Sequence, residues 1–213
     1  MGLFTRDIKT FEHLLVHGLQ DVYYAENRIV SALPKLIENA SDAELKRGLR
    51  LHLDETKGQV ELLEKVFRML GKEPSGTKCY GINGLISEGD EVMGNIANKK
   101  VLDAAIISAA QAVEHYEIAR YGSLVAWAEE MGRNDVARVL EKILTQEKAT
   151  DQKLTKLAEG RVNRQAEGKR VRAAAASRST ASRRRSGTAA RRGSATRTSS
   201  KSRSSAAKRR SAR

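Results

Sequence analysis

The sequence is poor in several kinds of residue, and each scarcity excludes a class of protein. Its 213 residues include one cysteine, Cys79, so no disulfide can form within the chain. No apolar run approaches the roughly 20 residues that a membrane-spanning helix needs. Residues 1–11 lack the apolar centre of a secretion signal. The sequence therefore predicts a cytoplasmic protein with no membrane partner.

Acidic residues are nearly absent from one part of the chain. Residues 161–213 contain 18 Lys/Arg and a single acidic residue, Glu167, for a net charge of +17. The first 160 residues contain 21 Lys/Arg and 25 Asp/Glu, for a net charge of −4. Residues 1–160 have the size of one ordinary domain with its own core. Residues 161–213 are mostly Ala, Ser, Arg, Thr and Gly, and this composition predicts a tail that is mostly disordered.

The basic residues of this tail form short clusters, which indicate a nucleic-acid partner. A flexible polycation binds phosphate backbones by releasing counterions, which gives salt-sensitive affinity without sequence preference. No aromatic residue is interleaved, so stacking on single strands is not expected. We expect DNA binding and association with the nucleoid, with RNA, an anionic membrane surface or a solubility role as alternatives. The candidate contact residues are Lys169, Arg170, Arg183, Arg184, Arg185, Arg191, Arg192, Lys208, Arg209 and Arg210.

Apolar residues at helical spacing predict four long helices in residues 1–160. Ser41 and Glu44 form the pattern of a capping box before the second helix, and Asn134 is placed to cap the fourth. Gly71 and Gly132 are placed to end the second and third helices. The expected ranges are Thr5 or Asp7 to Asn39, Ser41 to Leu70, Lys99 to Met131, and Asn134 to about Gly160.

The lengths of the connections predict how the helices are arranged. The first and second helices, and the third and fourth, are joined by tight turns, so each pair forms an antiparallel hairpin. A segment of about 27 residues with a short helix at 83–97 joins the two hairpins. This is the connectivity of a ferritin-like antiparallel four-helix bundle. Apolar residues that such a bundle leaves over, namely Leu102, Ile118 and Val125, favour a homodimer.

Carboxylates interrupt the apolar stripe of every long helix. Burying an unpaired carboxylate costs several kcal/mol, and converging carboxylates repel one another or stay protonated. A bound cation removes this conflict. Oxygen-rich ligand sets suit hard ions, and carboxylates inside a bundle are typical of two iron ions, with manganese as the alternative. The candidate ligands are Glu26, Glu55, Glu114, Glu117, Glu147 and Asp151, with His52 and Gln59 as further candidates. We expect no catalytic residue distinct from these ligands.

Four segments carry these residues: DVYYAENRIVSALPKL (21–36), HLDETKGQVELLEKVF (52–67), AAQAVEHYEIARYGSL (109–124) and LTQEKATDQKLTKLA (144–158). In their order and spacing they resemble the YciE/YciF-type ferritin-like proteins over about residues 5–160. The resemblance implies a ferritin-like bundle with a crossing helix and a role in the stress response. It also implies ferroxidase activity, the oxidation of Fe(II) by oxygen or peroxide.

The histidine positions depart from the wider ferritin-like pattern, which places His three residues after Glu on the second and fourth helices. Gly58 and Thr150 occupy those places here. Gln59 and Asp151 follow them directly, and His52 lies three residues before Glu55. This departure supports an alternative hypothesis, a non-enzymatic nucleoid-associated dimer whose bundle is an oligomerisation scaffold. Catalase activity of the manganese type is a third hypothesis.

Overall fold

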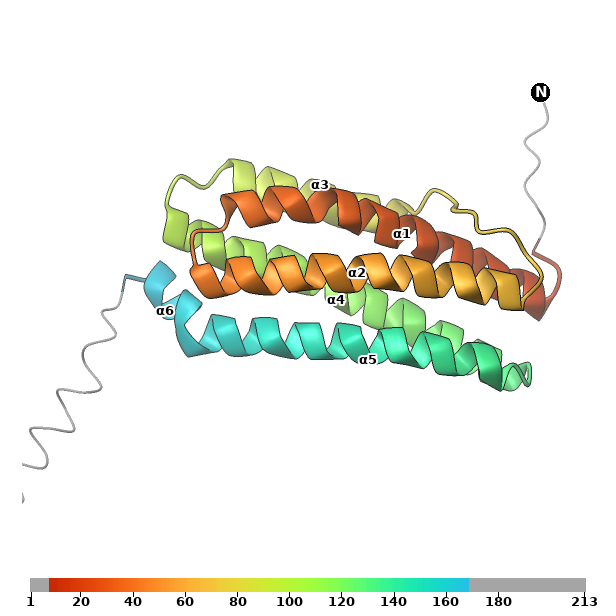
Figure 1. Cartoon of the computed structure of the whole chain (residues 1–213). Coiled ribbons are helices and arrows are strands. Elements are labelled where there is room, and N and C mark those ends of the chain that lie inside the picture. Colours follow the sequence, from red (N-terminus) through yellow and green to blue (C-terminus); the bar gives the residue numbers. More distant parts are fainter. Residues whose placement is uncertain (1–7, 169–213) are drawn as a thin grey trace, which may run out of the picture. The chain divides into compact units, whose positions relative to one another are not determined.

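The computed structural model describes residues 8–168, which form an all-α fold without β-strands (Figure 1). The long helices are α1 (Phe11–Asn39), α2 (Ala43–Met69), α4 (Lys99–Glu130) and α5 (Asn134–Leu157). The short helix α3 (Tyr80–Gly94) lies in the crossover and packs on α1 and α4. A π-helical turn (Ala158–Val162) and α6 (Asn163–Ala166) follow α5. The predicted four-helix bundle with one long crossover is confirmed.

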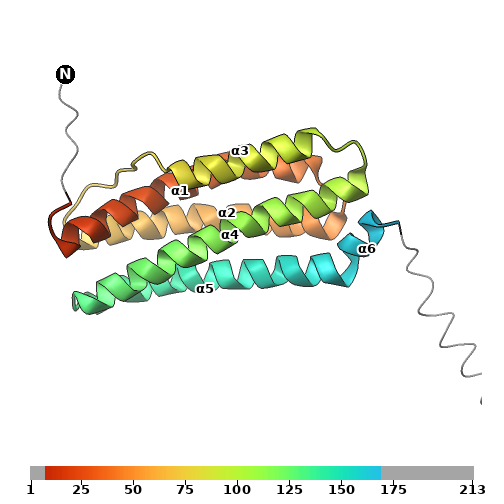
Figure 2. The ribbon, with the colours of Figure 1, turned by 180° about the vertical axis from the view of Figure 1, so that it is seen from behind.

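Two apolar clusters fill the bundle, one towards each end. The first contains Leu19 of α1, Val66 of α2, Leu124 of α4 and Leu140 of α5. In chain order α1 and α5 run from the first cluster to the second, whereas α2 and α4 run the opposite way. Figure 2 shows this arrangement from behind, with α3 along the outer side of α1 and α4. The middle of each long helix therefore lies between the two apolar clusters.

Four helices begin differently from the sequence prediction. Residues 8–10 are not helical, and the Thr10 side chain caps α1 by accepting from the backbone N–H of His13. Asp42, rather than Ser41, caps α2. Arg133 takes the cap position of α5 without a capping hydrogen bond from its side chain, so Asn134 is not the cap. The short helix also starts three residues earlier than predicted, at Tyr80. Caps depend on local side-chain geometry that a sequence pattern fixes only to within a few residues.

Ser41 does not cap α2 because it contacts the buried carboxylate of Asp103 on α4. The Ser41 backbone N–H and hydroxyl donate to Asp103 at 2.6 and 2.7 Å, and the backbone N–H of Asp42 donates at 3.2 Å. Arg161, at the start of the segment predicted to be tail, reaches back to Asp42 and Glu44 at 2.9 and 3.0 Å. These contacts join the α1–α2 turn to α4 and to the residues that follow α5.

The two predicted glycine stops are confirmed. Gly71 and Gly132 have φ values of 65° and 70°, a backbone region that favours glycine. The backbone N–H of Lys72 donates to the carbonyl of Phe67, and that of Arg133 donates to the carbonyl of Ala128. This is the Schellman pattern, which satisfies carbonyls at the end of a helix.

The residues offered as evidence for a dimer lie inside the bundle. Leu102 and Val125 are buried and Ile118 packs against the first apolar cluster, so these residues give no support to a homodimer, which stays a prediction. These residues were counted as unburied because the width of the buried stripe on each helix was underestimated. Within residues 8–168, none of the helices combines the length and the apolar character needed to cross a membrane.

Candidate metal centre

Six polar side chains from the four long helices meet between the two apolar clusters. None of the six is more than 5% exposed, although five of them are carboxylates or an imidazole. We call them the polar group: Glu26 of α1, His52 and Gln59 of α2, Glu114 and Glu117 of α4, and Glu147 of α5. The sequence placed these residues on the apolar stripes of their helices, and the structure shows that their side chains are buried.

The tightest part of the polar group joins α2, α4 and α5. One ligand atom each from His52, Glu114 and Glu147 lie within 4.8 Å of one another. His52 Nε2 is 3.1 Å from Glu114 Oε1, and Gln59 Nε2 donates to Glu147 Oε1 at 2.5 Å. On the other side, Tyr121 OH donates to Glu26 Oε1 at 2.5 Å. Three potential ligands that surround one point have the spacing of a first coordination shell.

When the carboxyl groups are ionised, most of the remaining polar atoms have no hydrogen-bond partner among residues 8–168. When protonated, Glu117 can donate to Glu26, and Glu147 can donate to Glu114. A buried polar atom without a partner costs about 1–3 kcal/mol, and native proteins contain few of them. A divalent cation would satisfy several such oxygens at once, so the donor set fits a hard metal ion. The unpartnered atoms are Glu26 Oε2, His52 Nδ1, Gln59 Oε1, Glu114 Oε2, Glu117 Oε1 and Glu147 Oε2.

Burial and mutual repulsion shift the proton affinities of the polar group upwards. Burial raises the pKa of Glu26 from 4.5 to about 7 even though the hydrogen bond from Tyr121 lowers it. Burial, followed by the charge of Glu26, raises the pKa of Glu147 to about 11 and holds that of Glu117 well above its usual range. Burial lowers the pKa of His52, but the interaction with Glu114 more than offsets this and raises it overall. Without a cation, the group therefore binds extra protons at neutral pH.

Two of the candidate ligands lie at the margin of the polar group. Glu55 is half-buried, accepts from Thr150 Oγ1 at 3.5 Å and lies 3.7 Å from Lys153 Nζ. Its charge still raises the pKa of Glu147, so it is near the group. Asp151 contacts other residues, because its Oδ1 accepts from Gln111 at 2.9 Å and lies 3.2 Å from the exposed His115. The structure thus brings Glu55 to the edge of the group and does not bring Asp151 into it.

Tyr121 and Thr150 contact candidate ligands, and the sequence analysis left both out of the site. Tyr121 is fully buried and lies one helical turn after Glu117, on the same face of α4. Thr150 stands where a ferritin-like histidine is expected, and it donates to Glu55 instead. Tyr121 could have been predicted as a neighbour of the site, because it follows Glu117 by four residues and so lies on the same face of the helix. The candidate nucleic-acid residues, from Lys169 onwards, lie outside the described residues.

Comparisons with known proteins agree with the fold. A family profile described as a domain of unknown function (DUF892) matches residues 10–167. Protein YciF of Escherichia coli strain K12 is 43% identical over 164 residues, which is 76% of this chain and 99% of YciF. The solved structure of YcfI from Rhodopseudomonas palustris is 57% identical, with a TM-score of 0.72, covering 73% of this chain and 99% of that one. The crystal structure of the E. coli stress protein YciF is 43% identical, with a TM-score of 0.70 and the same two shares.

Proposed function

Because this chain belongs to the DUF892 family and is a YciF-like protein, we propose that it is a ferritin-like stress-response protein that oxidises Fe(II) at a carboxylate-rich di-metal site. The observation that carries the proposal is the set of unpartnered carboxylate and imidazole atoms between the apolar clusters. A fold that needed only structural contacts would fill these positions with apolar residues, because buried carboxylates without a cation destabilise it.

The ligands would come from all four long helices. Glu26, Glu114, Glu117 and Glu147 would supply most of the oxygens, and His52 would supply one nitrogen. Glu55 lies at the edge, where it can exchange its contact with Lys153 for a contact with a cation. A ligand set so rich in oxygen suits iron and manganese better than zinc or copper. Bound iron would supply one-electron chemistry with oxygen or peroxide, and the Fe(II) that is oxidised is the substrate.

The surrounding residues hold the ligands in place and control their protons. Tyr121 orients Glu26 by donating to one of its oxygens, and Gln59 does the same for Glu147. The two apolar clusters on either side keep bulk water away, which strengthens every electrostatic interaction within the group. Because Glu117 and Glu147 hold protons in the cation-free protein, binding a metal would release them. Metal affinity would therefore rise with pH.

Because the Glu-x-x-His pairs are missing, the candidate site has fewer nitrogen ligands. His52 lies three residues before Glu55 instead of three after it, and its Nε2 faces Glu114 across the bundle. A single buried histidine in place of two makes the site poorer in nitrogen than the usual di-iron pattern. We expect weaker affinity for iron than that pattern gives, and a smaller advantage of iron over manganese.

The basic tail would place this chemistry beside DNA. Its net charge of +17 over residues 161–213 supports salt-sensitive binding to phosphate backbones. Removing Fe(II) and peroxide near the chromosome would limit damage to DNA. The test is fluorescence anisotropy with two unrelated duplexes across a salt series. We expect equal affinity for both duplexes, a steep fall with salt, and loss of binding when the chain is ended after Gly168.

A scaffold without enzymatic activity is the second candidate. The relative YcfI is described as a candidate structural protein, and Glu55 is already paired with Lys153. Metal analysis of the full chain, with Glu147→Gln beside it, separates the two functions. Metal in the wild type that is lost in Glu147→Gln, with DNA binding unchanged, supports the oxidase. Metal-free wild type that compacts DNA supports the scaffold.

A further inference from the structure

A cavity of about 270 Å³ lies between α2 and α5, beside the polar group. Its wall is mainly apolar and includes one residue of α4. The buried His52 and the half-buried Glu55 also line it, so the cavity reaches the edge of the polar group. The apolar part of the wall is formed by Leu45, Leu49, Leu51, Ala110, Leu154 and Leu157.

The cavity is large enough for a small organic molecule. An apolar cavity of about 150 Å³ accommodates benzene, so this one has room for roughly ten carbon atoms. Leu51 is 50% exposed, which extends the apolar wall outwards to the surface. A solvent-exposed leucine is ordinary by itself, but here it continues an apolar surface that leads inwards.

The acidic residues of the wall already have partners. Glu44 accepts from Arg161 at 3.0 Å, and Glu55 lies 3.7 Å from Lys153. These pairs give both carboxylates in the wall a cationic partner, although Arg161 is shared with Asp42. A cationic ligand would therefore find no free carboxylate there.

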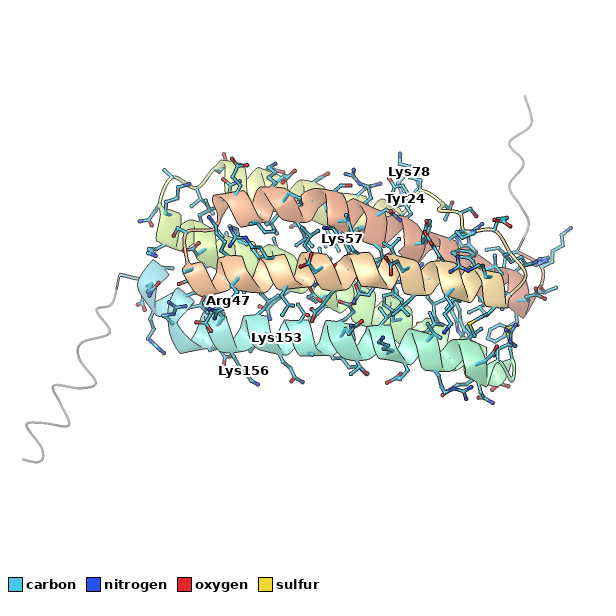
Figure 3. All side chains as sticks on the ribbon, in the orientation of Figure 1. Tyr24, Arg47, Lys57, Lys78, Lys153 and Lys156 are labelled. Carbon is cyan, nitrogen blue, oxygen red and sulfur yellow. The ribbon has the colours of Figure 1, made fainter. Side chains whose placement is uncertain are left out.

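Two cations at the entrance have no acidic partner among the described residues. Arg47 lines the cavity itself, and Lys156 lines an adjoining hollow that shares Lys153 and Leu157 with it. Figure 3 shows Arg47 on α2 and both lysines on α5 towards the α6 end of the bundle. Two unpaired cations beside an apolar cavity are complementary to a molecule with an anionic head and an apolar body.

Gly48 is an exposed glycine in the wall of the cavity. It lies within α2, where glycine is disfavoured relative to alanine, and it lines the cavity. A Cβ atom built there meets no other atom within 4 Å, so a side chain at this position would enter open space. The position therefore offers a way to block the cavity without disturbing the core.

We propose that the cavity between α2 and α5 binds an amphipathic carboxylate of roughly ten carbons. The chain packs against the leucines and Ala110, and the carboxylate pairs with Arg47 and Lys156. This binding site goes beyond the proposed metal chemistry and does not require a bound metal. A ligand in it would approach His52 and Glu55, and would so occupy one route to the polar group.

The test is a titration of the full chain with decanoate, followed by methyl NMR of Ala110 and Leu154 in about 0.15 M salt, which screens attraction to the basic tail. We expect saturable shifts of both methyl signals. Decyltrimethylammonium, which has the same chain and the opposite charge, is expected to bind at least tenfold more weakly. Vesicles of anionic phospholipid are expected to leave the two methyl signals unshifted.

Variants localise the binding. Gly48→Leu should abolish the shifts, and Gly48→Ala should retain them. Arg47→Gln with Lys156→Gln should raise the Kd about tenfold, the loss expected for charge-assisted contacts. The matched control is Arg50→Gln with Lys148→Gln, which removes one exposed cation from each of the same two helices outside the cavity wall.

Three results would overturn the proposal. The first is the absence of saturable shifts at Ala110 and Leu154. The second is unchanged decanoate affinity in Gly48→Leu, which would place the ligand elsewhere, including on the tail. The third is equal weakening by the control pair and by the Arg47 and Lys156 pair, which would mean general attraction between charges.

Discussion

Replacing Glu26 by glutamine should change the stability of the metal-free protein in a way that depends on pH. Burial raises the pKa of Glu26 from 4.5 to about 7, so the folded state holds this proton more tightly than the unfolded state does. The stability contributed by the bound proton is complete below about pH 4.5 and is lost as the pH rises through 7. Glutamine has the same shape, carries no ionisable proton, and keeps an oxygen that accepts from Tyr121.

The size of the effect follows from the shift. The rise in the pKa of Glu26 by about 2.5 corresponds to roughly 3 kcal/mol of unfolding free energy between the fully protonated and the fully ionised side chain. Between pH 5 and pH 8.5 we expect Glu26→Gln to gain about 2 to 3 kcal/mol in the free energy of unfolding relative to wild type. The gain should be largest at pH 8.5, where wild type must bury the ionised carboxylate.

Urea denaturation at the two pH values, with a chelator present, measures this difference. Glu38→Gln is the control, because it removes an exposed carboxylate from the same helix and should show no comparable pH dependence. The reasoning would be refuted if the difference in unfolding free energy between Glu26→Gln and wild type were the same at both pH values. It would also be refuted if the variant were less stable than wild type at pH 8.5.

Three further substitutions test other parts of the account. Tyr121→Phe removes the hydrogen bond that lowers the pKa of Glu26, and it should cost about 1–2 kcal/mol at pH 8.5 but less at pH 5, as measured by urea denaturation. Asp103→Ala removes three hydrogen bonds to the α1–α2 turn and should lower the unfolding free energy by about 3 kcal/mol, whereas the exposed Asp54→Ala should change it little. Gly18→Val should cost about 1–3 kcal/mol in thermal unfolding, because a Cβ there would lie 2.8 Å from the Leu124 side chain; no loss would mean that Leu124 moves freely.

Helix caps, glycine stops and the spacing of apolar residues predicted the fold. They did not predict how far each helix is rotated about its own axis. Caps, glycine stops and the two short turns determine where the helices begin and end, and this does not depend on which side chains pack together. A residue adjacent to a stripe lies only about 100° away, so packing decides which neighbour is buried. Leu63 is buried whereas its neighbour Leu62 is only partly buried, and Thr150 is more buried than Asp151. The same rotation leaves Asp151 partly buried outside the polar group, where it contacts Gln111 and His115.

The polar group was accessible to sequence analysis because its members interrupt apolar stripes at matching depths. Glu26 and Glu114 each have apolar residues one turn before and after them, and Glu147 has Ile143 one turn before it and Leu154 two turns after it. The role of His52 was less evident, because an isolated histidine on an apolar stripe indicates packing as readily as ligation. Only the three-dimensional structure shows its ring 3.1 Å from Glu114. Contacts between helices, such as Gln59 with Glu147, are likewise invisible to the period of a single helix.

The most direct test of the central claim is Fe(II) binding and oxidation by the full chain after chelator treatment. Fe(II) is titrated without oxygen, the bound metal is counted, and oxygen or peroxide is then added while absorbance is followed. The account predicts about two Fe(II) per chain and rapid oxidation, both lost in Glu147→Gln and both retained in Asp151→Asn, which changes a side chain outside the polar group. Wild type that retains no Fe(II), or Glu147→Gln that oxidises it at the wild-type rate, would contradict the account.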